Sequence, residues 1–292
     1  MTAADTVDSG QQGAKGRTTL GIIAGGGPLP GRVAAAAKAA GRDVFILGLE
    51  GFADPAVLRP WPHLINRVGA AGKTLHALRA HGCQDIVMIG PVRRPSFLDL
   101  RPDVEGTRIL ARIGRAAFAG DDGLLAAIIK VLAEEGFRVI GAHEVMREVL
   151  APAGLLTRAA PDAMALSDIE RGIAVARLLG DADIGQGCVV QQGLVLAVEA
   201  VEGTDAMLAR AGALRIDGAG GVLVKLCKPN QDRRADLPTI GLNTVRNAAA
   251  AGLRGVAFEA QATILAEREA TLAAADSAGL FLLGLEAERL RS

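Results

Sequence analysis

The segment from Lys225 to Gly241 gathers charged side chains that suit the chemistry of phosphate groups. It begins in an apolar run that predicts a buried strand, and its charged part stops at Leu237-Pro238. Lys and Arg neutralise phosphate oxygens, while carboxylate oxygens are ligands that suit Mg²⁺. A solvated loop whose charges cancel would have the same composition, but the apolar flanks favour a magnesium–diphosphate site. The charged members are Lys225, Lys228, Asp232, Arg233, Arg234 and Asp236.

A second polar segment, from Glu199 to Asp205, lies at the end of a strand predicted to begin at Leu194. Glu199 interrupts the apolar pattern of that strand, and a buried carboxylate needs a cation or hydrogen bonds. Glu202 follows at the end of the strand. Asp205 begins the next predicted helix, where a negative charge is favourable without any further role. Local structure therefore explains Asp205 more readily than Glu199, and the segment is a candidate source of metal ligands.

A glycine-rich loop, from Gly25 to Gly31, lies between the first predicted strand and the first predicted helix. Glycines at this position let backbone N–H groups approach a phosphate near the helix N-terminus. The spacing differs from the dinucleotide fingerprint, and a tight turn between strand and helix would explain it equally well. Glu50 follows the second strand, about where NAD enzymes carry a ribose-binding acid. An NAD-dependent oxidoreductase is therefore one alternative.

Two adjacent arginines, Arg93 and Arg94, follow a further predicted strand and are flanked by prolines. Guanidinium groups bind phosphate or carboxylate through two parallel hydrogen bonds. Ion pairs with aspartates of a surface loop are the alternative, but the position at the carboxyl edge of the sheet favours ligand binding. The pair His143-Glu144 follows the last strand of the same half of the chain. A functional role is one alternative for this pair, but a hinge or packing role is favoured.

Short apolar runs alternate with helical patterns in the first half of the chain. Four of them are Thr19–Ala24, Val44–Leu47, Ile86–Ile89 and Phe137–Ile140, and all are apolar apart from Thr19 and Arg138. Such strands are typical of a parallel sheet that is covered on both faces. We predict an N-terminal Rossmann-like α/β domain over residues 18–150, with helices on both faces of its sheet.

A second domain is predicted over residues 162–292, after a Pro/Gly-bearing linker at 151–161. Ser167-Asp168-Ile169-Glu170 has the capping-box pattern that opens a helix. Closely spaced strands on either side of Gln191-Gln192-Gly193 predict a hairpin. Because further strands alternate with helices, we predict an α/β domain with a mixed sheet. The polar residues 1–17 are expected to form a disordered leader.

The composition excludes several classes of protein. The 32 basic and 32 acidic residues cancel, so the chain lacks the basic surplus of a nucleic-acid-binding protein. The leader has no apolar core that would make it a signal peptide, and no run approaches the roughly 20 apolar residues of a membrane span. Cys83, Cys188 and Cys227 have neither metal-ligand nor disulfide spacing. We expect a soluble, cytoplasmic protein with reduced thiols.

Seven short motifs of this chain stand in the same order as in a known family. They are Gly25-Gly26-Gly27-x-Leu29-Pro30, Val92-Arg93-Arg94-Pro95, Gly120-Asp121-Asp122, Gly141-Ala142-His143-Glu144, Asp183-Ile184-Gly185-Gln186-Gly187, Glu199-Ala200-x-Glu202-Gly203-Thr204-Asp205-Ala206-Met207-Leu208 and Asp236-Leu237-Pro238-Thr239-Ile240-Gly241. Each motif is weak by itself, but the series is specific. On these residues the chain resembles the LpxI-type UDP-2,3-diacylglucosamine pyrophosphatases of lipid A biosynthesis. The resemblance runs from about Leu20 to near the C-terminus.

The resemblance implies a Mg²⁺-dependent hydrolase with two α/β domains and a lipid-bearing UDP-sugar held between them. In this family water attacks the β-phosphorus, and UMP and 2,3-diacylglucosamine 1-phosphate are released. The catalytic aspartate of the family matches Asp236, whereas Asp232 is less securely matched. A diacyl substrate also implies transient contact with the inner face of the membrane. A homo-oligomer is left open, and no nucleic-acid partner is expected.

These considerations assign roles to individual residues. Asp236, Lys225 and Asp205 are assigned to catalysis. Asp236, Glu199 and Glu202 are assigned to Mg²⁺. The predicted substrate-binding residues are Gly25, Gly26, Gly27, Pro28, Leu29, Arg93, Arg94, Asp122, Gln192, Lys228, Arg233 and Thr239. Two alternatives remain beside the hydrolase, namely the NAD-dependent oxidoreductase and a non-catalytic module that binds a nucleotide-sugar or a lipid.

Overall fold

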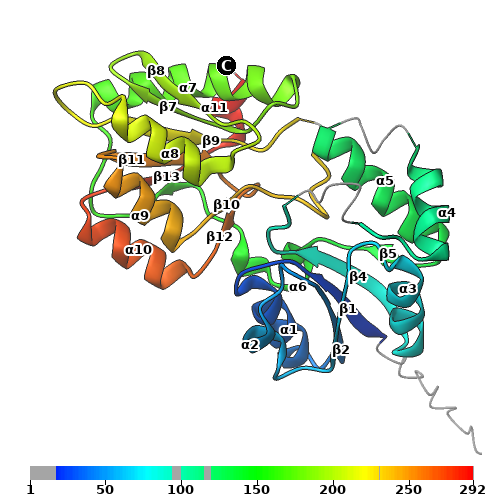
Figure 1. The fold of residues 1–292 in the computed structure, drawn as a ribbon. Helices are drawn as coiled ribbons and strands as arrows, with labels where there is room; N and C mark the ends of the chain where they lie inside the picture. Colours follow the sequence, from blue (N-terminus) through cyan, green and yellow to red (C-terminus); the bar gives the residue numbers. More distant parts are fainter. Residues whose placement is uncertain (1–17, 94–99, 115–119, 230, 292) are drawn as a thin grey trace, which may run out of the picture.

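The chain forms two α/β lobes, each built on its own sheet, which follow one another in the sequence (Figure 1). The expected leader, residues 1–17, and Arg94 lie outside the described residues. No helix in the described part of the chain is long and apolar enough to cross a bilayer. The computed structural model describes residues 18–93, 100–114, 120–229 and 231–291.

The sheet of the first lobe has five strands, all parallel, in the order β3-β2-β1-β4-β5. This is the Rossmann-like arrangement predicted from the apolar runs, with the order reversing between β1 and β4. The central strands are buried along almost their whole length. The strands are β1 (Thr19–Ala24), β2 (Val44–Leu49), β3 (His63–Asn66), β4 (Cys83–Ile89) and β5 (Arg138–Val139).

Helices cover both faces of this sheet, as predicted. Leu20 and Ile22 of β1 pack in one apolar layer, while Ile23 contacts the layer on the opposite face. Successive side chains of a strand point to opposite faces, so both faces of the sheet need an apolar cover. The first layer contains α1 (Leu29–Ala39), the short α2 (Pro55–Leu58) and α6 (Ala142–Val145); the second contains α3 (Ala71–Ala80), α4 (Val104–Ile113) and α5 (Gly120–Glu134).

The sheet of the second lobe has six strands in the order β6-β13-β11-β9-β7-β8. Strands β9, β11 and β13 are parallel, whereas β7 is antiparallel to both of its neighbours and β6 is antiparallel to β13. The mixed sheet and the hairpin between β7 and β8 are therefore confirmed. The strands are β6 (Gly154–Leu155), β7 (Gly187–Gln191), β8 (Leu194–Val198), β9 (Val222–Lys225), β11 (Gly255–Glu259) and β13 (Phe281–Leu285).

Helices also cover both faces of the second sheet. One layer is formed by three helices, and the other by one long helix and the C-terminal one. The first layer consists of α8 (Gly203–Ala213), α9 (Leu242–Ala250) and α10 (Arg268–Ser277); the second consists of α7 (Ala163–Asp181) and α11 (Ala287–Arg291).

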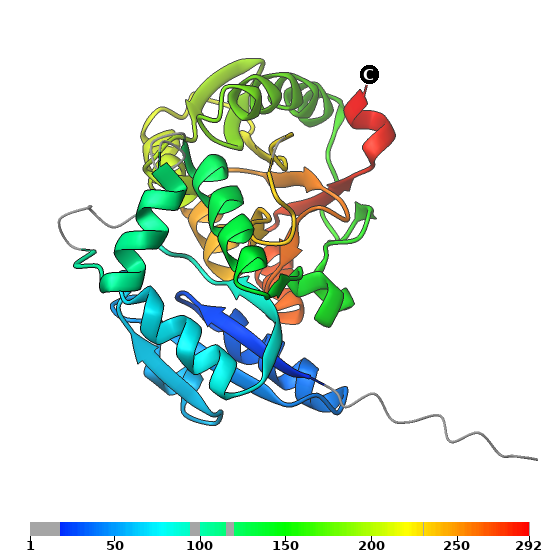
Figure 2. The same ribbon diagram turned by 90° about the vertical axis from the view of Figure 1, so that its right-hand side faces the viewer.

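A small parallel pair of strands, β10 (Thr239–Ile240) and β12 (Ile264–Leu265), connects the lobes. Leu237 and Ile264 belong to the same buried cluster as residues of α1 and α6. Figure 2 shows the two lobes from the side, with α6 and the short helix η2 (Arg147–Val149) between them. The lobes therefore share a continuous apolar core at their junction.

The boundary between the lobes differs from the predicted linker. Gly154 and Leu155, expected within the linker, form β6 and pair with Gly284 and Leu283 of the second sheet. Ala151 donates its backbone N–H to the carbonyl of Thr263 at 2.8 Å. The segment is thus anchored by backbone hydrogen bonds.

Helix α7 begins four residues earlier than its predicted capping box. Asp162 is the N-cap, and its carboxylate accepts a hydrogen bond from the N–H of Ala165 at 2.8 Å. Arg254 forms an ion pair with the same carboxylate. Ser167 therefore lies inside the helix, and the prediction of a capping box at Ser167 is wrong. Asp162 caps the helix in its place, because its carboxylate binds both the N–H of Ala165 and the guanidinium group of Arg254.

Replacing the two residues separately tests this assignment of the helix start. Asp162→Ala is expected to lower the urea midpoint of unfolding, because the N–H of Ala165 loses its acceptor. Ser167→Ala is the matched control and should leave the midpoint close to that of the wild type. Urea unfolding followed by circular dichroism measures both. An equal loss in the two variants would contradict the assignment.

Candidate active site

One edge of the second sheet collects the charged residues that were predicted from the sequence. Strands β8, β9 and β11 point in the same direction, because β7 is antiparallel to β8 and β9. Lys225 is the last residue of β9, Glu259 is the last of β11, and Glu199 directly follows β8. Asp183 precedes β7 and therefore belongs to the same edge. The topology thus places these four side chains at the end of the sheet from which the Lys225–Gly241 segment departs.

Lys225 and Glu199 form a buried polar group with Thr204. The ammonium group of Lys225 donates to the hydroxyl of Thr204 at 2.6 Å and lies 3.8 Å from Oε1 of Glu199. The hydroxyl of Thr204 donates to the same Oε1 at 2.6 Å. Both charged residues are only 6% exposed. Oε2 of Glu199 is buried and has no hydrogen-bond partner among the described residues, so this group keeps a spare acceptor.

Lys228 links the two lobes. Its ammonium group lies 2.7 Å from Oδ1 of Asp122, at the start of α5 in the first lobe, and 2.6 Å from Oδ1 of Asp183 in the second. The side chains of Lys228 and Asp122 are 9% and 11% exposed. The contact is therefore a largely buried bridge between the lobes.

The pKa values of this bridge reflect both burial and charge. Burial raises the pKa of Asp122 above its ordinary value; Lys228 opposes this shift, while Asp183 and Asp236 add to it. For Lys228 burial is the largest single influence and lowers the pKa. The hydrogen bonds to Asp122 and Asp183 together outweigh it, so the pKa of Lys228 is raised. Lys228 is thus held in its charged form.

Asp236 lies at the junction of the lobes, fixed by its neighbours in the loop. Nε2 of Gln231 donates a hydrogen bond to Oδ2 of Asp236. Oε1 of Gln231 accepts from the backbone N–H of Lys228 and from Sγ of Cys227, each at 3.2 Å. The next residue, Leu237, is buried in the cluster shared by the lobes. The carboxylate is thus held half-buried, within electrostatic reach of Asp122.

All four cations of the Lys225–Gly241 segment have a carboxylate partner. Arg233 lies 3.3 Å from Glu259, and Arg234 lies 2.6 Å from Asp232. Only the second of these pairs lies within the segment, since Lys225, Lys228 and Arg233 are paired with carboxylates of other segments. The alternative of a self-neutralised loop therefore applies to Arg234 alone.

The structure does not bring together the three carboxylates assigned to Mg²⁺. Glu202 is exposed and lies 2.5 Å from Arg210, while Glu199 and Asp236 have the separate contacts described above. In the described ranges no group of three or more His, Cys, Asp or Glu side chains could hold a metal ion. The reason is local: Glu199 contacts Lys225 and Thr204 at the sheet edge, whereas Glu202 lies at the surface, at the start of α8.

Three other predicted site residues make local contacts. Asp205, in the first turn of α8, is exposed and accepts a hydrogen bond from Asn247 at 2.8 Å. Thr239, in β10, donates to the carbonyl of Leu237 at 3.3 Å. Gln192 is in the turn of the β7–β8 hairpin, where its φ is 52° and its amide donates to the carbonyl of Asp217. It lies at the opposite end of β7 from the residue that pairs with Lys225, so the structure separates Gln192 from the other site residues.

The glycine-rich loop packs tightly on the turn that follows β4. The backbone N–H groups of Gly25 and Gly26 donate to the carbonyls of Ile89 and Pro91, at 2.9 and 3.0 Å. A Cβ on Gly25 would lie 2.3 Å from the carbonyl oxygen of Gly90. Close backbone packing therefore accounts for two of the three glycines. The loop does occupy the point of strand-order reversal between β1 and β4, where ligands bind in such sheets.

The remaining residues of this loop have different surroundings. Gly27 has a φ of 76° and an open side, whereas Leu29 is buried in the first lobe. Pro28 is exposed at the N-terminus of α1, and Arg93 is exposed after β4. Arg94, predicted beside Arg93, falls in a part of the chain that the structure does not describe.

Sequence reasoning did not assign Asp183, Gln231 or Thr204 to the site. Asp183 and Thr204 stand inside two of the motifs that carried the family resemblance, which was a usable signal. Gln231 lies among the charged residues of the Lys225–Gly241 segment, and its neutral side chain drew no notice there. Its role became visible only through its contacts with Asp236 and Lys228.

Comparison with known sequences gives a family for both lobes. The LpxI N-terminal domain matches residues 19–149, and the LpxI C-terminal domain matches residues 152–283. The chain belongs to the LpxI family. A relative from Caulobacter vibrioides, named UDP-2,3-diacylglucosamine pyrophosphatase LpxI, is 46% identical over 273 residues, which is 91% of this chain and 97% of that protein.

The LpxI match extends over both partners of the bridge between the lobes. Asp122 lies in the part matched by the LpxI N-terminal domain, and Lys228 and Asp236 lie in the part matched by the C-terminal domain. Among solved structures, the precorrin-6A reductase CobK covers 92% of this chain and 88% of its own, with 14% sequence identity and a TM-score of 0.32. At that score the likeness supports no functional conclusion.

Proposed function

We propose that this chain hydrolyses the diphosphate of UDP-2,3-diacylglucosamine and releases UMP and 2,3-diacylglucosamine 1-phosphate. The proposal is supported by the name of the Caulobacter vibrioides relative and by the two matching LpxI domains. The observation that carries it is the position of Asp236, a half-buried carboxylate between the lobes that Gln231 holds among paired cations.

In the proposed reaction Asp236 orients a water molecule and accepts its proton as the water attacks the β-phosphorus. The bond between the β-phosphorus and the bridging oxygen breaks, and UMP leaves with that oxygen. Gln231 contributes by fixing one carboxylate oxygen of Asp236, which leaves Oδ1 to face the water. A positioned carboxylate of this kind contributes about 100- to 10,000-fold to the rate of a proton transfer.

Lys225, Lys228 and Arg233 are proposed to neutralise the diphosphate. Each of them is held by a carboxylate, so the diphosphate would compete with Glu199, Asp122 or Glu259 for these cations. Cations that are already held at the site can stabilise the charge that develops on phosphoryl oxygens.

Mg²⁺ is proposed as the cofactor, bound together with the substrate. The ion often takes only one or two carboxylates from a protein and its other ligands from phosphates and water. The unpartnered, buried Oε2 of Glu199 fits such a role, and Asp236 is the second candidate ligand. An ionised carboxylate has about four acceptor positions, so Asp236 can hold the ion and still accept a hydrogen bond. Bound Mg²⁺ would draw charge from the phosphoryl oxygens.

Because the substrate carries two acyl chains, we propose that a cytoplasmic protein meets it by transient contact with the inner face of the membrane. Co-sedimentation with substrate-loaded liposomes tests this contact, and absence of binding would contradict it. The dinucleotide alternative gains no support from Glu50, which is exposed in the turn after β2. A titration that shows no saturable binding of NAD(H) would exclude an NAD-dependent oxidoreductase.

Product analysis tests the proposed function. Purified protein is incubated with UDP-2,3-diacylglucosamine in detergent micelles, with Mg²⁺ or with EDTA. The products are then separated and identified by mass spectrometry. We expect UMP and the diacyl sugar phosphate, no turnover in EDTA, and recovery when Mg²⁺ is restored. Saturable binding without turnover would instead support a binding module, and turnover that is insensitive to EDTA would contradict the metal.

A further inference from the structure

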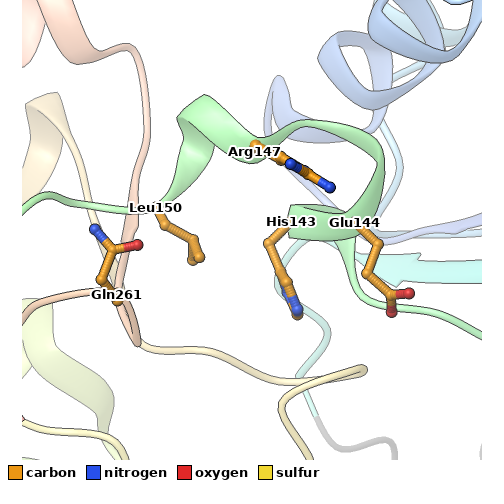
Figure 3. A pocket seen from close by; sticks show the side chains of 5 residues that line it. All are labelled: His143, Glu144, Arg147, Leu150 and Gln261. Carbon is orange, nitrogen blue, oxygen red and sulfur yellow. The ribbon is translucent and has the colours of Figure 1, made fainter.

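A cavity of about 460 Å³ lies at the junction of the lobes, outside the Lys225–Gly241 segment (Figure 3). Its volume falls within the roughly 300–1,000 Å³ typical of small-molecule sites. Four of its five lining residues are polar, so an acyl chain is a poor occupant. In Figure 3 Gln261 stands across the cavity from His143, with Leu150 between them. The lining residues are His143, Glu144, Arg147, Leu150 and Gln261.

Arg147 gives the cavity an available positive charge. It is exposed on η2, and the structure records no ion pair for it with the described part of the chain. The cations of the Lys225–Gly241 segment differ, because each already has a carboxylate partner. The one acid of the lining, Glu144, is engaged, since its Oε1 accepts the backbone N–H of Gly141 at 2.7 Å.

His143 is fixed at the edge of the cavity and has an unused ring nitrogen. The ring packs on Gly141, where an added Cβ would lie 2.3 Å from Cε1. Nδ1 is buried and makes no hydrogen bond with a described residue. A buried polar atom without a partner is uncommon in proteins and points to a missing ligand or water. The hinge or packing role expected for His143 therefore leaves this nitrogen unexplained.

Gln261 occupies a backbone conformation that favours glycine. Its φ is 58°, in the left-handed region, and its N–H donates to the carbonyl of Ala151 at 2.9 Å. A non-glycine residue in that region stores strain, and such residues cluster at binding sites. The side-chain amide carries both a donor and an acceptor, which suits the alternating carbonyl and N–H groups of a uracil ring.

We propose that this cavity binds the nucleoside monophosphate half of the substrate, with Arg147 and His143 at the phosphate and Gln261 at the base. The inference rests on the proposed function and adds a subsite to it. The cavity adjoins the loop of Asp236: Leu237 packs with Ala142 and Met146 in one buried cluster, and Glu144 lies within electrostatic reach of Arg234. A uridine nucleotide held here would direct its diphosphate toward that loop.

Titration calorimetry of the full-length protein tests the subsite with UMP, inorganic phosphate and 2,3-diacylglucosamine 1-phosphate. Arg147→Ala should weaken UMP binding about 10- to 100-fold, the range for loss of a charge-assisted hydrogen bond. The same variant should leave the affinity for the diacyl sugar phosphate unchanged. Arg246→Ala, which removes an exposed guanidinium from α9, is the matched control and should bind UMP like the wild type.

Gln261→Gly separates binding from folding. Glycine adopts the left-handed conformation without strain, so the melting temperature should be no lower than that of the wild type, while UMP affinity falls and phosphate affinity stays. Two results would contradict the proposed subsite even if the wild type hydrolyses the substrate. One is that Arg147→Ala binds UMP as tightly as the wild type, and the other is that it loses affinity for the diacyl sugar phosphate instead of for UMP. A wild type without turnover would instead refute the proposed function.

Discussion

Asp236→Asn is expected to lower the turnover of UDP-2,3-diacylglucosamine about 100- to 10,000-fold and to leave the protein folded. Asparagine has the same size and keeps an oxygen that can accept the hydrogen bond from Gln231. It has no negative charge, so it cannot accept the proton of the attacking water. Initial rates at saturating substrate measure the loss, and the melting temperature shows whether the fold is retained.

Asp232→Asn is the matched control for this experiment. Asp232 lies in the same loop, but its carboxylate is paired with Arg234 at 2.6 Å. We expect its turnover to stay within a few-fold of the wild type. If the two variants lose activity equally, or if Asp236→Asn turns over like the wild type, the role given to Asp236 is wrong.

Lys228→Met is expected to destabilise the protein by about 3–5 kcal/mol. Methionine fills a similar volume but leaves the carboxylates of Asp122 and Asp183 without their shared cation, and Asp122 is only 11% exposed. Removing one partner of a buried pair costs far more than the net contribution of the pair, because the remaining charge stays out of water. The free energy of unfolding in urea measures the effect.

The pH dependence of Lys228→Met follows from the carboxylate that remains. Burial already raises the pKa of Asp122, and loss of the opposing charge on Lys228 raises it further. The folded variant therefore binds that proton more tightly than the unfolded chain does. Its deficit against the wild type should be largest above this raised pKa and should shrink as the pH falls through it.

Lys38→Met provides the control for the loss of a lysine ion pair. Its partner is Asp43, and the two side chains are 60% and 75% exposed. An exposed pair of this kind contributes little to stability, so Lys38→Met should unfold at nearly the same urea concentration as the wild type. Equal destabilisation by the two substitutions would contradict the assignment of Lys228 as a buried bridge. So would a deficit of Lys228→Met that grows as the pH falls.

The main strands of both lobes could be predicted because they are buried on both faces. Strands β1, β2 and β4 each contain an apolar run that is followed by glycine or turn residues. The strand β3 was missed, since only Asn66 of its four residues is buried. Helix α4 was missed as well, although Asp103 caps it with a hydrogen bond to Gly106 at 2.6 Å. Short edge strands and single caps give too little local signal.

The charged segment of the site could be predicted, but its partners could not. Lys228 and Asp236 follow an apolar strand, and this order is visible in the sequence. The contact between Lys228 and Asp122 joins two lobes and depends on how they pack. Glu199 and Glu202 are neighbours in sequence but face a buried sheet edge and the surface, so their spacing suggested a shared metal site that the fold does not build.

Hydrolysis in heavy-oxygen water tests most directly whether this chain cleaves the diphosphate by attack at the β-phosphorus. The wild type and Asp236→Asn are each incubated with UDP-2,3-diacylglucosamine and Mg²⁺ in H₂¹⁸O. Mass spectrometry then measures how much heavy oxygen each product contains. We expect the wild type to place one heavy oxygen in 2,3-diacylglucosamine 1-phosphate and none in UMP, and the variant to yield little product. Intact substrate, or label in UMP, would contradict the account.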